Sequence, residues 1–87
     1  MTEETLLEFP CRFPIKIMLR ANVDLQPLVD ELVAPHAPDI SADDVNFRPS
    51  SKGNFVSVTV TINATSKAQI DDIYQALTDS KDVLMSL

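Results

Sequence analysis

Glycine, cysteine and histidine each occur once in the 87 residues of this chain, and tryptophan is absent. The single cysteine, Cys11, cannot form a disulfide within the chain, so a reducing cytoplasm is the simplest compartment. The single histidine, His36, has no second histidine with which to hold a metal ion. One glycine is too few for a glycine-rich loop around a phosphate group. The sequence therefore predicts a cytoplasmic protein without a metal or another cofactor.

Basic residues and long apolar runs are scarce as well. Seven Lys and Arg residues stand against 13 Asp and Glu residues, which gives a formal net charge of −6. This balance argues against nucleic acid or an anionic membrane as the main partner, because phosphate binding needs clustered Lys and Arg. No apolar run approaches the roughly 18 residues of a membrane span. The acidic start, MTEETLLEF, is typical of neither a signal peptide nor a transit peptide.

The chain does contain clear periodic patterns of apolar residues. Period-two alternation predicts four strands, at residues 13–20, 45–49, 55–63 and 82–87. In the second strand, Val45 and Phe47 are expected to face the core. Helical spacing predicts a first helix over residues 24–34, with Asp24 as its cap. A second helix is predicted to begin at the capping box of Ser66 and Gln69.

The resulting order is strand, helix, strand, strand, helix, strand. With right-handed crossovers this order predicts an α+β, ferredoxin-like sandwich, in which two helices cover one face of a four-stranded antiparallel sheet of order 4-1-3-2. The length allows one domain, which we assign to residues 13–87. Residues 1–12 are predicted to form an N-terminal arm. Its apolar Leu6, Leu7 and Phe9 need a surface to pack on, at a sheet edge or on a neighbouring subunit.

The segment SSKGN, residues 50–54, falls where a hairpin loop between the two middle strands is needed. Gly53 permits a positive φ and Asn54 tolerates one, so we interpret both as structural turn residues. Single-stranded RNA binding is an alternative, because the RNA-recognition motif has this element order and a Lys–Gly pair before its third strand. That motif needs alternating aromatics, and only Phe55 is present here. Three further loop residues are candidates for a secondary binding role: Ser50, Ser51 and Lys52.

The candidate surface for a ligand or partner is the sheet face that points away from the helices. Lys16, Arg48 and Arg20 are expected on it, beside Met18, Phe55 and Leu84. Such a mixed basic surface on an acidic protein fits an anionic ligand or the acidic arm of another copy. An ordinary solvated sheet face is the simpler interpretation.

An acylphosphatase-like hydrolase is the competing prediction. Acylphosphatases share this topology and hold phosphate with an arginine in the first loop, while an asparagine of strand two orients water. Arg20 and Asn46 are the residues that would do so here. The chain has no glycine-rich turn to supply backbone N–H groups around the anion, which weakens this interpretation.

Two segments, LLEFPCRFPIKIM (6–18) and PSSKGNFVSVTVTINAT (49–65), resemble the YbeD-like family of small bacterial proteins of unknown function. The resemblance covers nearly the whole chain. It implies a fold similar to ACT domains, the small regulatory modules that bind amino acids at dimer interfaces of metabolic enzymes. The chain departs from the expected pattern at Leu19, where we expect a glycine. The segment LRANVDLQP, residues 19–27, contains no glycine.

The resemblance therefore implies a regulatory or protein-interaction module that is not an enzyme. The small core and the two unpaired edge strands favour a homodimer. A metabolic enzyme or a small anionic metabolite is the further partner that we expect, bound at the sheet face or at the dimer interface. No membrane partner is expected.

Overall fold

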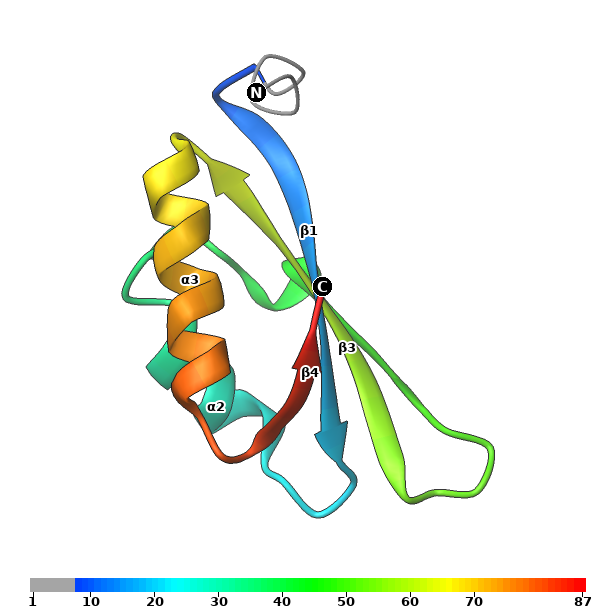
Figure 1. The fold of residues 1–87 in the computed structure, drawn as a ribbon. Coiled ribbons are helices and arrows are strands. Elements are labelled where there is room, and N and C mark those ends of the chain that lie inside the picture. The colour runs from blue at the N-terminus through cyan, green and yellow to red at the C-terminus, as the bar shows by residue number, and fades with distance from the viewer. Residues whose placement is uncertain (1–7) are drawn as a thin grey trace.

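The computed structural model describes residues 8–87. It contains four strands, two α-helices and one short 3-10 helix, which are β1 (Cys11–Arg20), α2 (Leu25–Leu32), η1 (Ala42–Asp44), β2 (Val45–Pro49), β3 (Phe55–Ala64), α3 (Lys67–Asp79) and β4 (Val83–Ser86). The strands form one antiparallel sheet of order β2-β3-β1-β4. Both helices lie on the same side of this sheet (Figure 1). The predicted ferredoxin-like α+β fold and the strand order 4-1-3-2 are therefore confirmed.

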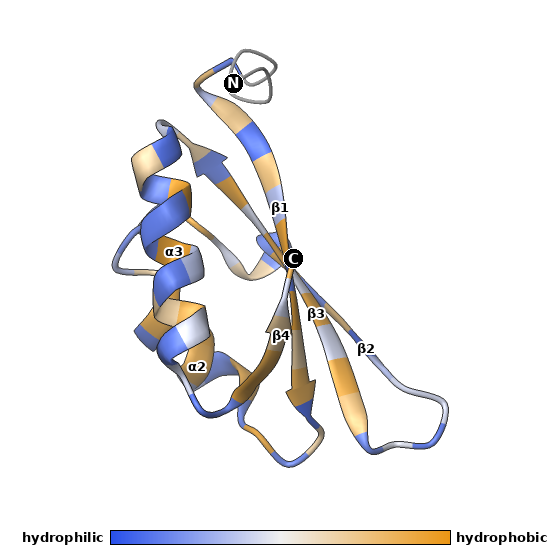
Figure 2. Ribbon diagram, viewed as in Figure 1, coloured by the Kyte–Doolittle hydropathy of each residue, from blue (hydrophilic) through white to orange (hydrophobic). Residues whose placement is uncertain are grey.

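The two long central strands carry the core because their side chains alternate strictly between the two faces. β1 and β3 pair over ten positions, from Cys11 with Ala64 to Arg20 with Phe55. The side chains of these two strands that point toward the helices are buried or half-buried. Figure 2 shows hydrophobic and hydrophilic residues alternating along β1. The largest fully buried side chains are Ile15, Ile17, Leu19, Val29, Val33, Val58, Val60, Ile62, Ile73 and Leu77.

The N-terminal boundary differs from the predicted one by two residues. β1 begins at Cys11, so residues 11–12 of the predicted arm belong to the sheet. Phe9 is half-buried and packs against the core. The rest of the predicted packing concerns Leu6 and Leu7, which lie outside the described residues, so it stays a prediction.

The two helix starts use different chemistry. At α3, the Ser66 hydroxyl accepts a hydrogen bond from the Gln69 N–H at 3.1 Å, as the capping box predicts. The side-chain oxygen Oε1 of Gln69 accepts from the Thr65 N–H at 2.7 Å, one residue before the expected partner Ser66. At α2, the predicted side-chain cap is wrong, since Asp24 is the N-cap but makes no capping hydrogen bond. The third helical residue is Pro27, which lacks the N–H that such a cap most often uses.

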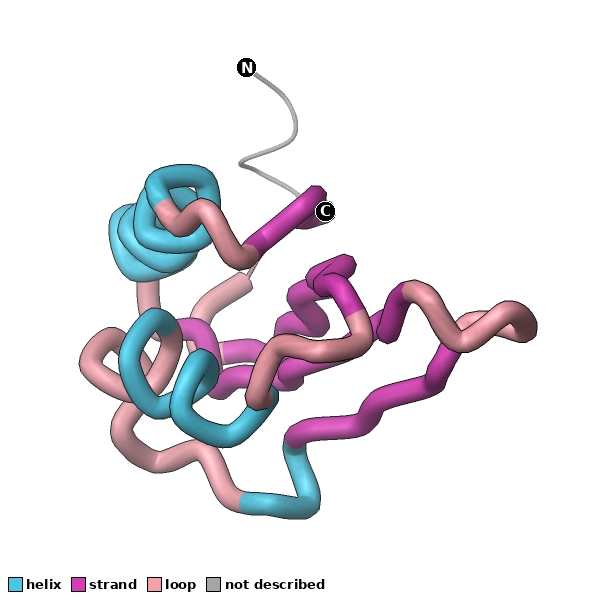
Figure 3. The backbone as a smooth tube through the Cα atoms, turned by 90° about the horizontal axis from the view of Figure 1, so that it is seen from below, coloured by secondary structure: helices cyan, strands magenta, loops and turns pink. Residues whose placement is uncertain are grey.

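The prediction that Phe47 of the second strand is buried in the core is wrong. Phe47 pairs with the buried Val58, so it lies on the helix side of the sheet as expected, yet it is 64% exposed. The reason is that the β2–β3 hairpin projects beyond the helices (Figures 1 and 3), so no helix covers this end. An apolar groove of about 370 Å³ remains there, lined by Val23, Leu25, Phe47, Pro49 and Val56 among others.

Candidate functional site

The face of the sheet opposite the helices is the open sheet face (Figure 3). Strand alternation and register place a defined set of side chains on it. They are Lys16, Met18 and Arg20 of β1, Asn46 and Arg48 of β2, Phe55, Ser57 and Thr59 of β3, and Met85 of β4. The structure thus brings together the predicted Lys16, Arg48, Arg20 and Phe55 on one face.

Charge is segregated between the sheet and the rest of the described chain. Every charged residue within the four strands is basic, and these residues are Arg12, Lys16, Arg20 and Arg48. The acidic residues between positions 8 and 87 all lie in helices, in η1 or in loops. Both α-helices carry exposed carboxylates, such as Asp30 on α2 and Asp71 on α3. An acidic protein therefore presents a basic sheet face.

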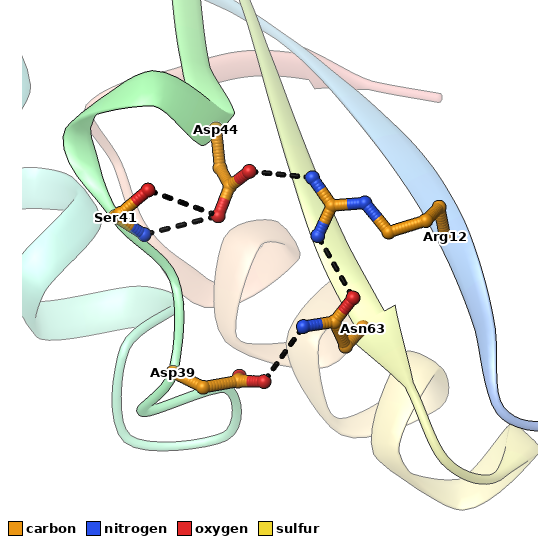
Figure 4. A network of polar contacts seen from close by, with 5 residues as sticks. All are labelled: Arg12, Asp39, Ser41, Asp44 and Asn63. Atoms are coloured by element: carbon orange, nitrogen blue, oxygen red, sulfur yellow. Dashed lines mark hydrogen bonds and ion pairs between the residues drawn. The ribbon is translucent and has the colours of Figure 1, made fainter.

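Arg12 is neutralised by a polar network at one end of β1 (Figure 4). Its guanidinium donates to the carboxylate of Asp44 and, at 2.8 Å, to the side-chain oxygen of Asn63. The Asn63 amide in turn donates to Asp39 at 2.8 Å. The hydrogen bond from Arg12, followed by one from the Ser41 backbone, holds the pKa of Asp44 below its usual value of 3.8. This network fastens the 39–44 segment to the sheet and leaves the other three strand cations as the candidates.

Lys16 and Arg48 flank a depression of about 300 Å³, also lined by Asn46, Phe47, Ser57 and Thr59. In register, Thr59 lies between Lys16 and Asn46, and Ser57 lies between Met18 and Arg48. The two cations are therefore diagonal neighbours across β3, with Cα atoms about 12 Å apart by strand spacing and rise. Within residues 8–87, neither charged group has a hydrogen-bond or ion-pair partner. Both long side chains can converge on one anion above the two hydroxyls.

An apolar cluster adjoins this depression on the side of β4. Met18 pairs with Met85, and Lys16 exchanges two backbone hydrogen bonds with Leu87 at 3.0 and 2.8 Å. Met85 is 52% exposed and Leu87 is 71% exposed, and Figure 2 shows β4 as largely hydrophobic. The sequence prediction chose Leu84 for this face instead. A register shift between Met18 and Leu19 puts Met85 beside Met18, which strand alternation alone does not reveal.

The hairpin loop is built around backbone contacts. Gly53 has a φ of +77°, the left-handed conformation that favours glycine. Its N–H donates to the carbonyl oxygen of Ser50 at 3.0 Å, and the Ser50 hydroxyl accepts from the Phe55 N–H. Asn54 does not adopt a positive φ, and its carbonyl oxygen accepts from the Ala21 N–H. Ser51 and Lys52 are exposed at the hairpin tip and do not line the depression.

The residues of the acylphosphatase alternative do not form one site. Arg20 is opposite Phe55, whereas Asn46 is opposite Thr59 on the far side of β3. Two strand spacings and four residues of rise put their Cα atoms about 16 Å apart. Arg20 instead lines a separate cleft of about 430 Å³, together with three carboxylates, those of Asp24, Glu31 and Asp82. Those carboxylates oppose the binding of a phosphate group there.

Within residues 8–87, no three His, Cys, Asp or Glu side chains are grouped so that they could hold a metal ion. No helix in this part of the chain has the length and apolar character needed to cross a membrane.

The fold has a counterpart among solved structures. Protein HP0495 of Helicobacter pylori, whose solution structure is known, matches with a TM-score of 0.70. The match covers 93% of this chain and 85% of that protein at 14% sequence identity. At this identity, the likeness concerns the fold alone.

Curated bacterial proteins match the chain over its length. A UPF0250 protein of Chromobacterium violaceum is 46% identical over 85 residues, which cover 98% of this chain and 96% of that protein. A UPF0250 protein of Nitrosomonas europaea is 45% identical over 87 residues and covers both chains completely. These names describe no enzymatic activity. The family model DUF493, described as a protein of unknown function, matches residues 4–87. The chain therefore belongs to this family of small bacterial proteins, which confirms the YbeD-like resemblance.

Proposed function

We propose that this protein is a small interaction module, without catalytic activity, that binds anionic groups of a partner through its open sheet face. The observation that carries the proposal is the diagonal pair of Lys16 and Arg48 above Ser57 and Thr59. The two cations supply positive charge and hydrogen-bond donors, and the two hydroxyls can both donate and accept hydrogen bonds. Such a set recognises a carboxylate or another anion and has no evident nucleophile with a base.

The distribution of charge supports the same conclusion. A chain with a formal net charge of −6 repels anions over most of its surface. The sheet face is the exception, because the carboxylates lie in helices and loops rather than in strands. Complementary charge of this kind contributes mainly to the choice of partner and to the orientation of docking.

Two alternatives from the sequence receive less support. An acyl-phosphate hydrolase needs Arg20 and Asn46 in one site, and the strand register separates them. Single-stranded RNA binding needs stacking platforms on the central strands, where Phe55 is the one exposed aromatic and Met18 occupies the other outward position. A small regulatory role, as implied by the ACT-like resemblance, is compatible with an anionic metabolite or a metabolic enzyme as the ligand.

A homodimer stays a prediction, which light scattering can test. Docking of two open sheet faces would bring Lys16 and Arg48 of both copies together, and like charges across an interface oppose such a contact. We therefore expect self-association to use a different surface, at the sheet edges.

The proposal is tested with poly-L-glutamate as a carboxylate-rich probe. We expect the wild-type protein to bind it, and the double variant Lys16→Gln/Arg48→Gln to lose at least tenfold in affinity. The matched control is Lys67→Gln/Lys81→Gln, which removes the same charge at positions outside the sheet. The control variant should bind as the wild type does.

Each result is decisive for the proposal. Equal losses in both double variants would mean that net charge alone controls binding, and this outcome would overturn a specific site. Absence of binding by the wild-type protein at low salt would also overturn it. Turnover of a generic acyl phosphate that disappears in Arg20→Ala would replace the proposal with the hydrolase alternative.

A further inference from the structure

The open sheet face offers two kinds of surface side by side. The cationic depression between β1 and β2 carries Lys16 and Arg48. The apolar cluster between β1 and β4 carries Met18, Met85 and Leu87, of which Leu87 is 71% exposed. Four strands span about 14 Å between the axes of the two edge strands. One ligand of moderate width can therefore contact both surfaces at once.

An extended peptide fits this face poorly. Over the apolar cluster it would leave its backbone N–H and C=O groups without partners, because the side chains beneath offer none. Addition at the β2 edge is also limited. The Ser50 N–H donates to the Phe55 carbonyl oxygen, so by alternation the outer edge of β2 consists of Val45, Phe47 and Pro49. The Val45 N–H already donates to Ala42, and Pro49 has none, which leaves a single donor.

An α-helix satisfies its own backbone and is about 10–12 Å wide with its side chains. Laid on the face along β1, it can press one apolar stripe against the Met18 and Met85 side chains. Its flank toward β2 then lies above Lys16 and Arg48. Resting on the proposed function, we infer that the open sheet face takes an acidic amphipathic helix of a protein partner.

Within residues 8–87, α3 of a second copy does not supply such a helix. The exposed positions of α3 include Asp71, Asp72 and Asp79, which have the required charge. Its large apolar side chains, however, are directed into its own core, where Ile70, Ile73 and Leu77 are buried. A helix from a second copy would therefore offer carboxylates to Lys16 and Arg48 but nothing for the apolar cluster. We therefore assign the helix to a different protein. Displacement of the patterned peptide by a synthetic peptide of residues 1–12 would overturn this assignment in favour of the acidic arm of a second copy.

The experiment uses two synthetic peptides of about 18 residues, long enough to form a helix. Both contain the same Leu, Glu and Ala residues. In the patterned peptide, Leu recurs at i, i+3, i+4 and i+7 with Glu on the flanks, whereas the order is shuffled in the other. We expect the patterned peptide to bind at least tenfold more tightly by fluorescence anisotropy, and to gain helical circular dichroism on binding.

Substitutions in the protein identify the surface that contacts the peptide. Met85→Ser changes an exposed side chain, so the fold should persist, and we expect at least a fivefold loss of affinity for the patterned peptide. Phe47→Ser is the comparison variant, because Phe47 is also apolar and exposed but has its Cβ on the helix side of the sheet, where it lines the apolar groove and borders the depression. It should lose less affinity for the patterned peptide than Met85→Ser does. Lys16→Gln/Arg48→Gln should weaken both the patterned peptide and poly-L-glutamate.

The outcomes separate the two proposals. Equal binding of the patterned and shuffled peptides, with poly-L-glutamate still bound, would overturn the helical partner and leave the proposed function standing. Binding of citrate alone, with no binding of either peptide, would overturn the helical partner in favour of a small anion. Loss of peptide binding in Phe47→Ser but not in Met85→Ser would place the contact in the apolar groove and overturn the inference. Failure of every anionic probe would overturn both.

Discussion

At residue scale, Gly53 is selected by its backbone conformation and by nothing else that surrounds it. Its φ of +77° lies in the left-handed region, which costs a residue with a Cβ about 1 kcal/mol or more. A Cβ at this position would meet no atom within 4 Å. The cost of a substitution therefore comes from the chain conformation and not from a collision.

We expect Gly53→Ala to lower the free energy of unfolding by about 1 kcal/mol. Gly53→Asn should lower it by less, because Asn adopts the left-handed region more readily. Urea unfolding measures both changes. The neighbouring exposed Lys52 supplies the control, since Lys52→Ala should leave the unfolding curve where it is. A loss for Lys52→Ala comparable with that for Gly53→Ala would contradict this account of the turn.

The lowered pKa of Asp44 makes the folding stability depend on pH in the acid range. The hydrogen bond from Arg12 lowers its pKa in the folded state from 3.8. A carboxyl group with a lowered folded pKa contributes stability above its unfolded pKa, and this contribution disappears as the pH falls through the folded pKa. The contribution is therefore complete at neutral pH and is lost in the acid range.

We predict that Arg12→Gln has a lower melting temperature than the wild type at pH 7. The difference should narrow as the pH falls below about 4, because the wild type then loses the same interaction. Lys81→Gln is the control, since it removes one positive charge at an exposed loop position. If the difference in melting temperature between Arg12→Gln and the wild type stayed constant down to pH 3, the guanidinium would act by packing rather than by charge.

At the scale of elements, the two helices differ in how their first turns are satisfied. α3 begins with a side-chain hydrogen bond from Gln69 N–H to Ser66. The Gln69 amide also donates to the carbonyl oxygen of His36 at 2.7 Å, which ties α3 to the segment after α2. α2 begins at Asp24 without a capping bond, and Pro27 removes one of its backbone donors.

This difference gives a paired prediction. Ser66→Ala should cost about 1 kcal/mol of stability, the usual value of a lost N-cap hydrogen bond. Asp24→Ala should cost no more than a few tenths of a kcal/mol, which is the contribution of a charge near a helix N-terminus. Thermal unfolding of the two variants under the same conditions compares them directly. Equal costs would show that the Ser66 hydrogen bond is not what stabilises α3.

The strands show which parts of the fold and site are predictable. Alternation along a strand is a local property, so β1 and β2 assigned Lys16 and Arg48 to one face, while the aliphatic residues of β1 and β3 were assigned to the other. Whether a helix covers a given position of the sheet is not a local property. The exposure of Phe47 depends on where α2 begins relative to the hairpin. The place of Met85 depends on a register shift opposite Met18. Arg12 and Asp44 are 32 residues apart in the chain, and no periodic pattern connects them.

At the scale of the whole molecule, element order and handedness determined the topology, because a four-stranded antiparallel sheet with two crossovers has few alternatives. Composition argues against nucleic acid and an anionic membrane as main partners, which stays a prediction, and it does not identify a ligand. The candidate site became definable only when the register put two cations next to an apolar cluster. Side chains from all four strands contribute to it, and their relative positions are set by pairing between distant segments.

The separation of basic sheet from acidic helices also makes the molecule an electric dipole with its positive pole at the open sheet face. A negatively charged partner first meets the repulsion of the overall charge of −6, which reaches further than the attraction of the dipole. Moderate salt, with a Debye length of about 10 Å at 0.1 M, suppresses the far repulsion more than the near attraction. The association rate with an acidic partner should consequently pass through a maximum as the salt concentration rises. The dipole should also orient the open sheet face toward the partner before contact is made.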